Sequence, residues 1–326
     1  MNACTAIKPY ATKNGMISMR DSAYLYGPVL SRRLGRSLGI SPFITKYCNF
    51  DCLYCQLGPT AALTNTPAQG VAVETLIAAF NTFLKSGIAY DTVTVSGLGE
   101  PTLYRDLKKL LIRLKTCTDK PVTLITNGAR FDHRDVFDAA LEADIVLPTV
   151  MSEPVSLAET IHRPHPHVNL KASTVYLKQF SQEFHGELWL EVMLLKDIND
   201  SAQSLRAFKQ TLKGIRYDRL YINVPLRAGT DKSAQVPPLK RVMMFAEALE
   251  GISIEALAEG VYQSAVTDDY EAILNIIRTH PLHRHEIEVF MKHRQSDATR
   301  ILKRLNQDPR VRASSMKGLT SYRLKH

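Results

Sequence analysis

Cysteine is scarce in this sequence, and long hydrophobic runs are missing. The 326 residues include five cysteines, far too few for a secreted scaffold held together by disulfides. No window approaches the roughly 18 consecutive apolar residues of a transmembrane helix, and the N-terminal stretch MNACTAIKPYATKNG has no apolar core of a signal peptide. We therefore expect a cytoplasmic protein without a membrane partner, whose thiols stay reduced.

The charge of the chain is positive and unevenly placed. There are 41 Lys and Arg against 32 Asp and Glu, a net charge of +9. Residues 266–326 hold 12 basic and seven acidic residues, so +5 of the +9 lies in less than a fifth of the chain. An excess of this kind favours solubility or a polyanionic partner and says nothing about the fold.

Strand and helix patterns alternate from about residue 40 onward. The predicted strands are Ile40–Tyr47, Thr92–Ser96, Val122–Thr126, Asp144–Val150, Leu188–Leu195 and Arg219–Val224. The predicted helices are Val73–Lys85, Leu103–Leu114, Asp135–Glu142, Val168–Phe184, Ser201–Leu212 and Leu239–Leu249. This alternation predicts an α/β fold with a parallel sheet. Six units are too few for an eightfold barrel, so an open doubly wound sheet or a three-quarter barrel is expected, with the site at the carboxyl ends of the strands.

The pattern changes after residue 265. Helical spacing covers Tyr270–Thr279, His285–Lys292 and a third helix capped by Ser296, and two strands follow, Val311–Ala313 and Thr320–Leu324 around Lys317-Gly318. Three helices and a hairpin in 61 residues predict a winged helix. We therefore expect a flexible lead-in at 1–23, an α/β domain at 24–265 and a winged-helix-like domain at 266–326.

Three of the five cysteines, Cys48, Cys52 and Cys55, form a C-x3-C-x2-C group directly after the first predicted strand. Three thiolates on one loop can hold three corners of a [4Fe–4S] cluster, which usually takes four cysteines. The remaining iron would then be open to a substrate or cofactor. Zinc is the alternative, but structural zinc needs four ligands. The histidines that could complete such a site lie over 100 residues away, at His162, His165 and His167.

This cysteine spacing, with Tyr54 before the last cysteine, resembles the signature of the radical S-adenosylmethionine (SAM) enzymes. The resemblance implies a (βα)6 partial barrel with the cysteine loop after the first strand, in agreement with the strand count. It also implies that the open iron chelates SAM, that a flavodoxin- or ferredoxin-type reductant provides one electron, and that a 5′-deoxyadenosyl radical takes a hydrogen from the substrate. The cofactors would carry the chemistry while the protein orients them.

Further residues match positions near SAM in that family. The segment Gly97-Leu98-Gly99-Glu100-Pro101 resembles its GGEP motif, whose backbone and Glu meet the SAM amino group, although such a turn alone indicates only tight backbone geometry. Candidates at later strand ends are Thr126, Asn127, Ser152, Glu191 and Asn223. Asn127 could equally serve a turn. Glu191 lies in an apolar strand that should be buried, so its carboxylate needs a partner. The candidates are the SAM ribose, the substrate and an arginine.

Three segments indicate a branch of the family: Gly27–Gly39, Cys55–Gly58 and Trp189–Leu194. They resemble a widespread uncharacterised set grouped loosely with the wyosine-forming tRNA enzymes. Strict equivalence to the tRNA enzyme is not expected, because Cys4 and Cys117 cannot supply the three ligands of a second cluster. No cysteine follows Cys117, which argues against the methyl-carrier mechanism of the RNA-methylating branch.

Two groups of basic residues are candidates for phosphate or substrate contacts. Arg32, Arg33 and Arg36 precede the cysteines in a glycine-interleaved stretch and are interpreted as a functional basic loop, with surface charge as the alternative. On the third C-terminal helix the basic face is Arg300, Lys303 and Arg304. A basic helix and wing is the arrangement that binding to phosphates requires. The alternative roles for this domain are to dock on a partner, to act as a lid, or only to present a solvated charged face.

Three functions remain open from the sequence. The first is a radical SAM enzyme acting on a nucleic acid, with tRNA as the first candidate. The second is a radical SAM enzyme acting on a small metabolite or a protein, with the C-terminal domain as a docking module. The third is a non-enzymatic DNA-binding sensor that holds an iron–sulfur cluster or zinc.

Overall fold

The computed structural model describes residues 24–151, 153–256, 262, 264, 266–316 and 318–325. Its main feature is a sheet in which eight strands follow one another in chain order, from β1 to β8. Strand β1 is antiparallel to β2, and the strands from β2 onward are parallel to one another. Their bounds are β1 Leu25–Ser31, β2 Gly35–Ile40, β3 Thr92–Val95, β4 Val122–Thr126, β5 Ile145–Pro148, β6 Glu187–Met193, β7 Arg219–Asn223 and β8 Ile252–Ser253. The predicted α/β fold with a parallel sheet is confirmed.

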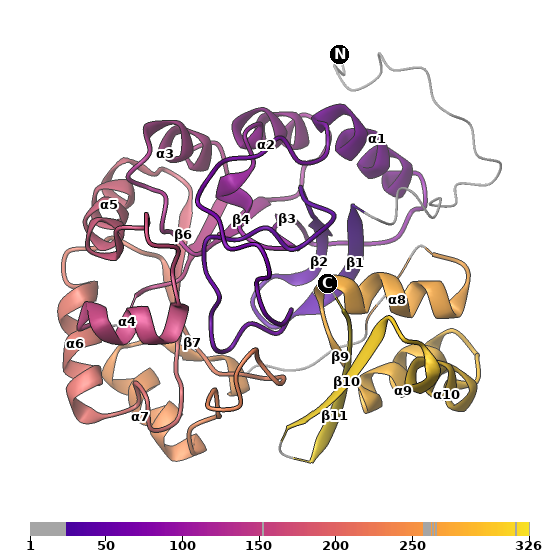
Figure 1. Cartoon of the computed structure of the whole chain (residues 1–326). Helices are drawn as coiled ribbons and strands as arrows, with labels where there is room; N and C mark the ends of the chain where they lie inside the picture. Colours follow the sequence, from indigo (N-terminus) through magenta and orange to yellow (C-terminus); the bar gives the residue numbers. More distant parts are fainter. Residues whose placement is uncertain are drawn as a thin grey trace.

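Helices connect the parallel strands and lie on the outside of the sheet (Figure 1), except for Val155–His162, which ends beside the cysteine loop. They are α1 Val73–Leu84, α2 Leu107–Lys115, α3 Arg134–Ala140, α4 Val155–His162, α5 Leu170–Glu183, α6 Ala202–Leu212 and α7 Leu239–Ala248. Apolar residues spaced by three and four face the strands, as Leu76, Ile77 and Phe80 of α1 do. They pack on alternate strand positions such as Val93 and Val95, all of them buried. Helix α4 was not predicted.

The first predicted strand is misplaced. The structure begins the parallel series with β2 at Gly35–Ile40 and not with Ile40–Tyr47, which leads into the cysteine loop. Together β1 and β2 form a hairpin from the stretch that was interpreted as a basic loop. Leu38 and Ile40 are fully buried, and β2 pairs with β3 through Ser37–Ile40. These pairings with neighbouring strands outweigh the low strand propensity of the local glycines.

The chain after residue 265, called here the C-terminal unit (residues 266–316 and 318–325), forms helices and a second sheet. Its elements are α8 Asp269–Thr279, β9 Leu282–His283, α9 Arg284–His293, α10 Ala298–Gln307, β10 Val311–Met316 and β11 Leu319–Leu324. The antiparallel sheet has the order β10-β11-β9. Asp297, and not Ser296, caps α10 by accepting a hydrogen bond from the backbone of Thr299. Among the described residues, no helix is long and apolar enough to cross a membrane.

The C-terminal unit packs against the large sheet beside β1 (Figure 1). Tyr26 and Val29 of β1 belong to its hydrophobic core, and Asn275 Nδ2 of α8 donates to the Leu25 carbonyl at 2.9 Å. A further contact reaches the loop after β7, where the ring of His283 is hydrogen-bonded to the Leu226 carbonyl at 3.0 Å. The unit therefore touches the sheet at β1, one edge, and near β7, beside the other edge.

Candidate functional site

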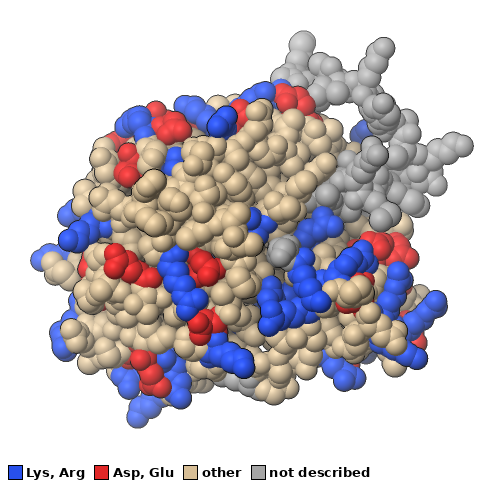
Figure 2. Space-filling model, viewed as in Figure 1, with Lys and Arg blue, Asp and Glu red and all other residues tan. Residues whose placement is uncertain are grey.

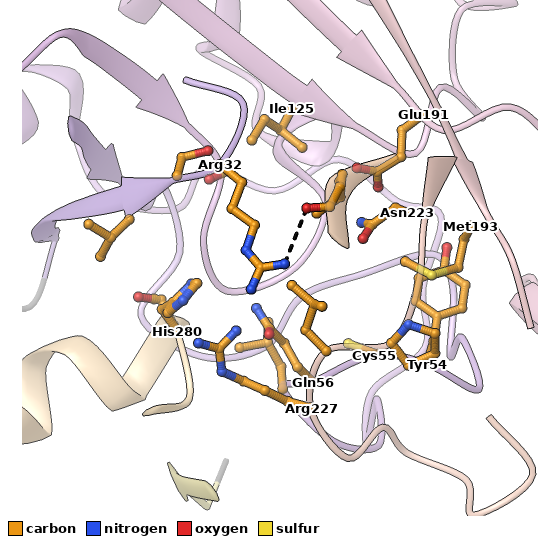
Figure 3. A pocket seen from close by; sticks show the side chains of 18 of the residues that line it. Arg32, Tyr54, Cys55, Gln56, Ile125, Glu191, Met193, Asn223, Arg227 and His280 are labelled. Carbon is orange, nitrogen blue, oxygen red and sulfur yellow. Dashed lines mark hydrogen bonds between the residues drawn. The ribbon is translucent and has the colours of Figure 1, made fainter. Parts of the chain in front are cut away.

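A cavity of about 710 Å³ lies at the carboxyl ends of the parallel strands. We call it the pocket (Figure 3). Its size falls within the usual range of small-molecule sites. Most of the residues proposed from the sequence line it: Arg32, Arg33, Cys48, Cys52, Cys55, Gly97, Gly99, Glu100, Thr126, Asn127, Glu191 and Asn223. Ser152 lies outside the described residues.

The cysteine loop is held in place by main-chain hydrogen bonds. Asp51 N donates to the His162 carbonyl and Leu53 N to the Ile161 carbonyl, so the end of α4 supports the middle of the loop. Cys55 N donates to the Cys52 carbonyl at 3.1 Å, which forms a turn between these two cysteines. Cys48, Cys52 and Cys55 are half-buried and face one common cavity.

The donor set of the loop fits an iron–sulfur cluster. Burial raises the pKa of the Cys48 thiol to about 12, and Glu100 and Cys55 raise it further. Burial also raises the pKa of Cys52 well above its usual value, with a further rise from Cys55 and Cys48. Three thiolates there require a strongly positive partner. Among the described residues no group of three or more His, Cys, Asp or Glu is arranged to hold a single metal ion. Three thiols spread along one wall suit a cubane better than zinc.

Gly97 and Gly99 bring their loop against the backbone that leads to Cys48. Both have positive φ, +117° and +112°. Gly99 is bridged to Tyr47, and Glu100 N donates to the Tyr47 carbonyl at 2.9 Å. A Cβ on Gly99 would overlap that carbonyl, and one on Gly97 would crowd Ser41 Oγ. The Tyr47 backbone therefore leaves no room for a side chain at Gly99, and Ser41 leaves none at Gly97. Both glycines line the pocket.

Glu100 joins the glycine loop to the end of β4. Its carboxylate is 3% exposed. Oε1 accepts from Thr126 Oγ1 at 2.6 Å and from the backbone and hydroxyl of Thr102, and Oε2 accepts from Asn127 N at 2.8 Å. Burial raises the pKa of Glu100, and these hydrogen bonds oppose that rise. Asn127 Nδ2 in turn donates to Asn49 Oδ1 at 2.7 Å, which ties the strand end to the cysteine loop.

His162 is far from the cysteines in sequence but touches them in the fold. Its Nδ1 lies 3.2 Å from the hydroxyl of Tyr54 and 3.6 Å from Cys52 Sγ. Burial lowers its pKa to about 4, so the ring is neutral near pH 7. His162 reaches Cys52 only because the fold places the end of α4 beside the cysteine loop. His165 and His167 do not line the pocket.

Glu191 and the β1–β2 turn form part of a second wall of the pocket. Glu191 makes an ion pair with Arg33, which is the arginine pairing considered for this carboxylate, and both residues line the pocket. Burial lowers the pKa of Arg33 to about 10. Arg32 Nη1 donates to the Ile254 carbonyl at 3.2 Å. Arg36 is exposed and pairs with Asp91 at 2.6 Å, so it does not share the pocket with the other two arginines.

Sequence reasoning missed the other half of this wall, a buried network across two parts of the chain. Arg227, 6% exposed, follows β7, and its Nη2 donates to Glu286 Oε1 at 2.8 Å and to the Tyr262 hydroxyl at 3.1 Å. Tyr262 also contacts His280 Nε2 at 2.8 Å. Burial opposes the charge of Arg227, but Tyr262 and Glu286 raise its pKa overall. In Figure 3 Arg32, Arg227 and His280 lie across the cavity from Tyr54 and Met193. No local motif marks these residues.

The basic residues of α10 lie outside the pocket. Arg300 and Lys303 are exposed. Arg304 is exposed too, and its guanidinium lies over the Tyr270 ring, 3.7 Å from the ring centroid, which holds it against α8. Figure 2 shows Lys and Arg gathered around the C-terminal hairpin, whose exposed basic residues include Arg312 and Lys325. The helix and the hairpin thus both present positive charge to solvent.

Comparison with known proteins gives four matches, one to a family model and three to individual proteins. A family model described as the radical SAM superfamily matches residues 43–206. "GTPase Obg" of Brachyspira hyodysenteriae is 32% identical over 91% of this chain, which spans only 45% of that protein. A "UPF0026 protein" of Helicobacter pylori is 31% identical over 82% of this chain and 87% of its own length. A "probable dual-specificity RNA methyltransferase RlmN" of Acholeplasma laidlawii is 22% identical, over 74% of this chain and 71% of that protein.

Proposed function

The chain belongs to the radical SAM superfamily, and on this premise we propose that it is an iron–sulfur enzyme that cleaves SAM reductively and takes a hydrogen atom from a substrate. Members of the superfamily bind a [4Fe–4S] cluster and SAM. The observation that carries the proposal is the pocket itself. Residues spread from Cys48 to Asn223 in the sequence line one cavity, with three thiols on one wall.

In this proposal Cys48, Cys52 and Cys55 hold the cluster. When bound, the cluster and SAM supply the electron and the 5′-deoxyadenosyl radical, chemistry that no side chain offers. The protein binds and orients them. Glu100 Oε2 accepts one hydrogen bond, from Asn127 N, and an oxygen with a further lone pair can face the SAM ammonium. Gly97 and Gly99 allow close approach of the backbone.

The remaining cofactor contacts come from Thr126, Asn127, Glu191 and Asn223, and from Ser152 outside the described part of the chain. Arg32 and Arg33 line the same cavity, and in this proposal they contact the substrate. A substrate held between the two walls is therefore close to the radical and shielded from water, as hydrogen abstraction requires.

We also propose that the substrate is a nucleic acid, with tRNA as the leading candidate, and that the C-terminal unit is a winged helix that binds it. The order helix, strand, helix, helix, hairpin supports this reading. Exposed Arg300 and Lys303 on α10 and Arg312 on β10 supply phosphate contacts. Arg304, engaged with Tyr270, contributes less. The name of the Acholeplasma relative refers to an RNA methyltransferase, which agrees with an RNA substrate.

Anaerobic purification followed by iron, sulfide and SAM-cleavage assays tests the enzyme. We expect about four irons and four sulfides per chain and 5′-deoxyadenosine after reduction with dithionite. Cys48→Ala, Cys52→Ala and Cys55→Ala each abolish the cluster, while the control Cys117→Ala, outside the pocket, keeps it. Zinc without sulfide would contradict the proposal. A cluster without SAM cleavage would favour the sensor.

Salt-dependent tRNA binding tests the substrate class. Arg300→Ala and Lys303→Ala each reduce the slope of log affinity against log salt by about 1, whereas Lys109→Ala, on the surface of α2, leaves it unchanged. Binding that is absent, or equal in all variants, would favour a small metabolite or protein substrate with the C-terminal unit as a docking module. Mass analysis of tRNA and metabolites from a deletion strain then identifies which is modified.

A further inference from the structure

Two buried cations flank the loop that carries Cys55. Lys46 is 8% exposed, and its Nζ lies 3.3 Å from Cys55 Sγ while it also donates to the Gly58 carbonyl. Arg323, in the last strand β11, is 9% exposed, and its Nη1 donates to the Leu57 carbonyl at 2.5 Å. One cation thus comes from the chain just before the cysteines, and the other from the C-terminal unit 277 residues later.

The loop is shaped to admit Arg323. Gly58 has φ +89°, a conformation that side chains rarely adopt, and a Cβ there would overlap the Arg323 guanidinium. Gly58 N also donates to the Cys55 carbonyl at 3.1 Å, so the turn that follows Cys55 continues directly into the contact with both cations. The position of the Cys55 end of the loop therefore depends on Lys46 and Arg323 together.

Neither cation has a carboxylate partner within ion-pair distance among the described residues. Burial lowers the pKa of Arg323, and the neighbouring positive charge of Arg312 lowers it further. A buried charge without an opposite charge is strongly unfavourable. The groups that could compensate it are the thiolates of the cysteine loop, and with them the sulfides of a cluster. Two uncompensated cations beside one cysteine therefore point to a negatively charged centre there.

We propose that Lys46 and Arg323 are positioning residues of the cluster site, and that their charges raise its reduction potential. The inference rests on the function proposed above. One electron from an external donor of the flavodoxin or ferredoxin type converts [4Fe–4S]2+ to [4Fe–4S]+, with no bond made or broken. The site gains one negative charge, which a nearby cation stabilises. An N–H donor to a ligand sulfur acts in the same direction.

A redox titration of the reconstituted full-length protein, followed by electron paramagnetic resonance, tests this inference. In Lys46→Met we expect the equilibrium constant for reduction to fall about tenfold, a midpoint lower by ~59 mV for one electron. Arg323→Met lowers it by less, because Arg323 contacts a carbonyl and not the sulfur. Lys46→Arg and Arg323→Lys keep the charge and stay near the wild-type value. Lys109→Met, a surface lysine paired with Glu74, is the matched control.

The result separates this inference from the proposed function. A wild-type protein that holds no [4Fe–4S] cluster contradicts the function. If the wild type and Lys46→Met hold equal iron and sulfide and have the same midpoint, the inference is wrong while the function stands. If Lys46→Met assembles no cluster, the comparison of Arg323→Met with Arg323→Lys decides: a lower midpoint only in Arg323→Met supports the inference, and equal midpoints overturn it.

Discussion

The two walls of the pocket are constructed differently. The cysteine wall is largely backbone against backbone, as where Gly99 meets Tyr47. The opposite wall consists of long charged side chains that reach across the cavity edge, as where Arg227 meets Glu286. The first arrangement tolerates no added volume, and the second tolerates no loss of a charge. The same cavity therefore has a sterically sensitive side and an electrostatically sensitive side.

The largest expected effect is on the charged wall. Arg227→Met leaves Glu286 buried without its partner, and we expect the free energy of unfolding to fall by about 3–5 kcal/mol. Urea denaturation, followed by the fluorescence of Trp189, the single tryptophan, measures it. Removing both charges in Arg227→Met/Glu286→Gln recovers part of the loss. The control is Arg36→Met, which breaks the exposed pair of Arg36 with Asp91. It should lower the free energy of unfolding by much less. Equal losses in Arg227→Met and Arg36→Met would show that burial does not distinguish the two pairs.

On the backbone wall, Gly99→Ala combines an unfavourable φ with overlap on the Tyr47 carbonyl. We expect a loss of about 3 kcal/mol, together with loss of cluster binding after reconstitution. Gly87→Ala is a matched control, because Gly87 has φ +69° but nothing within 4 Å of the added Cβ. It should cost about 1 kcal/mol. Similar losses at both positions would mean that conformational strain alone explains Gly99.

Glu100 lies on the backbone wall but depends on charge, so it tests how sharply the walls differ. Glu100→Gln places an amide group against donors from Thr126, Thr102 and Asn127, and we expect a loss of about 2 kcal/mol. Thr126→Val removes one donor and should cost about 1 kcal/mol. Thermal or urea unfolding checks both. A Glu100→Gln variant as stable as wild type would assign the carboxylate to ligand binding alone.

The effect that is smallest at neutral pH concerns protonation at the charged wall. Burial, and then the charge of Arg227, lower the pKa of His280 to about 3. The ring of the unfolded chain titrates at ~6.5, so unfolding takes up one proton below that pH. The free energy of unfolding therefore keeps the full contribution of neutral His280 above this pH. On acidification below it, the free energy of unfolding falls by ~1.4 kcal/mol per pH unit. We expect His280→Gln to remove this slope between about pH 6 and 4.5. His162 adds a pH dependence of the same sign. The measurement is therefore the difference between the wild type and His280→Gln in how the free energy of unfolding changes with pH. An unchanged slope would contradict a neutral buried His280.

Local patterns in the sequence predicted much of the fold. Five of the six predicted strands overlap β3 to β7, and the C-terminal helices lie where apolar spacing placed them. The prediction of the first strand was wrong because Gly35–Ile40 has a weak strand propensity. This segment is a strand because it pairs with β1 and β3. The three arginines interpreted as one loop were separated for the same reason, since the hairpin turns Arg36 away from Arg32 and Arg33. The winged-helix class and the domain boundaries remain predictions.

The sequence by itself determined the chemistry of the cysteine wall. Cys48, Cys52 and Cys55 lie within eight residues, and the glycine loop is marked by residues whose backbone freedom is visible in their type. Only the tertiary structure decided the rest of the site. Arg33 with Glu191, Arg227 with Glu286, His162 beside Cys52, and Arg323 under Gly58 join segments separated by tens to hundreds of residues. Such pairs leave no local pattern, because burial and distance between remote segments, and not spacing along the chain, determine how strongly two groups interact.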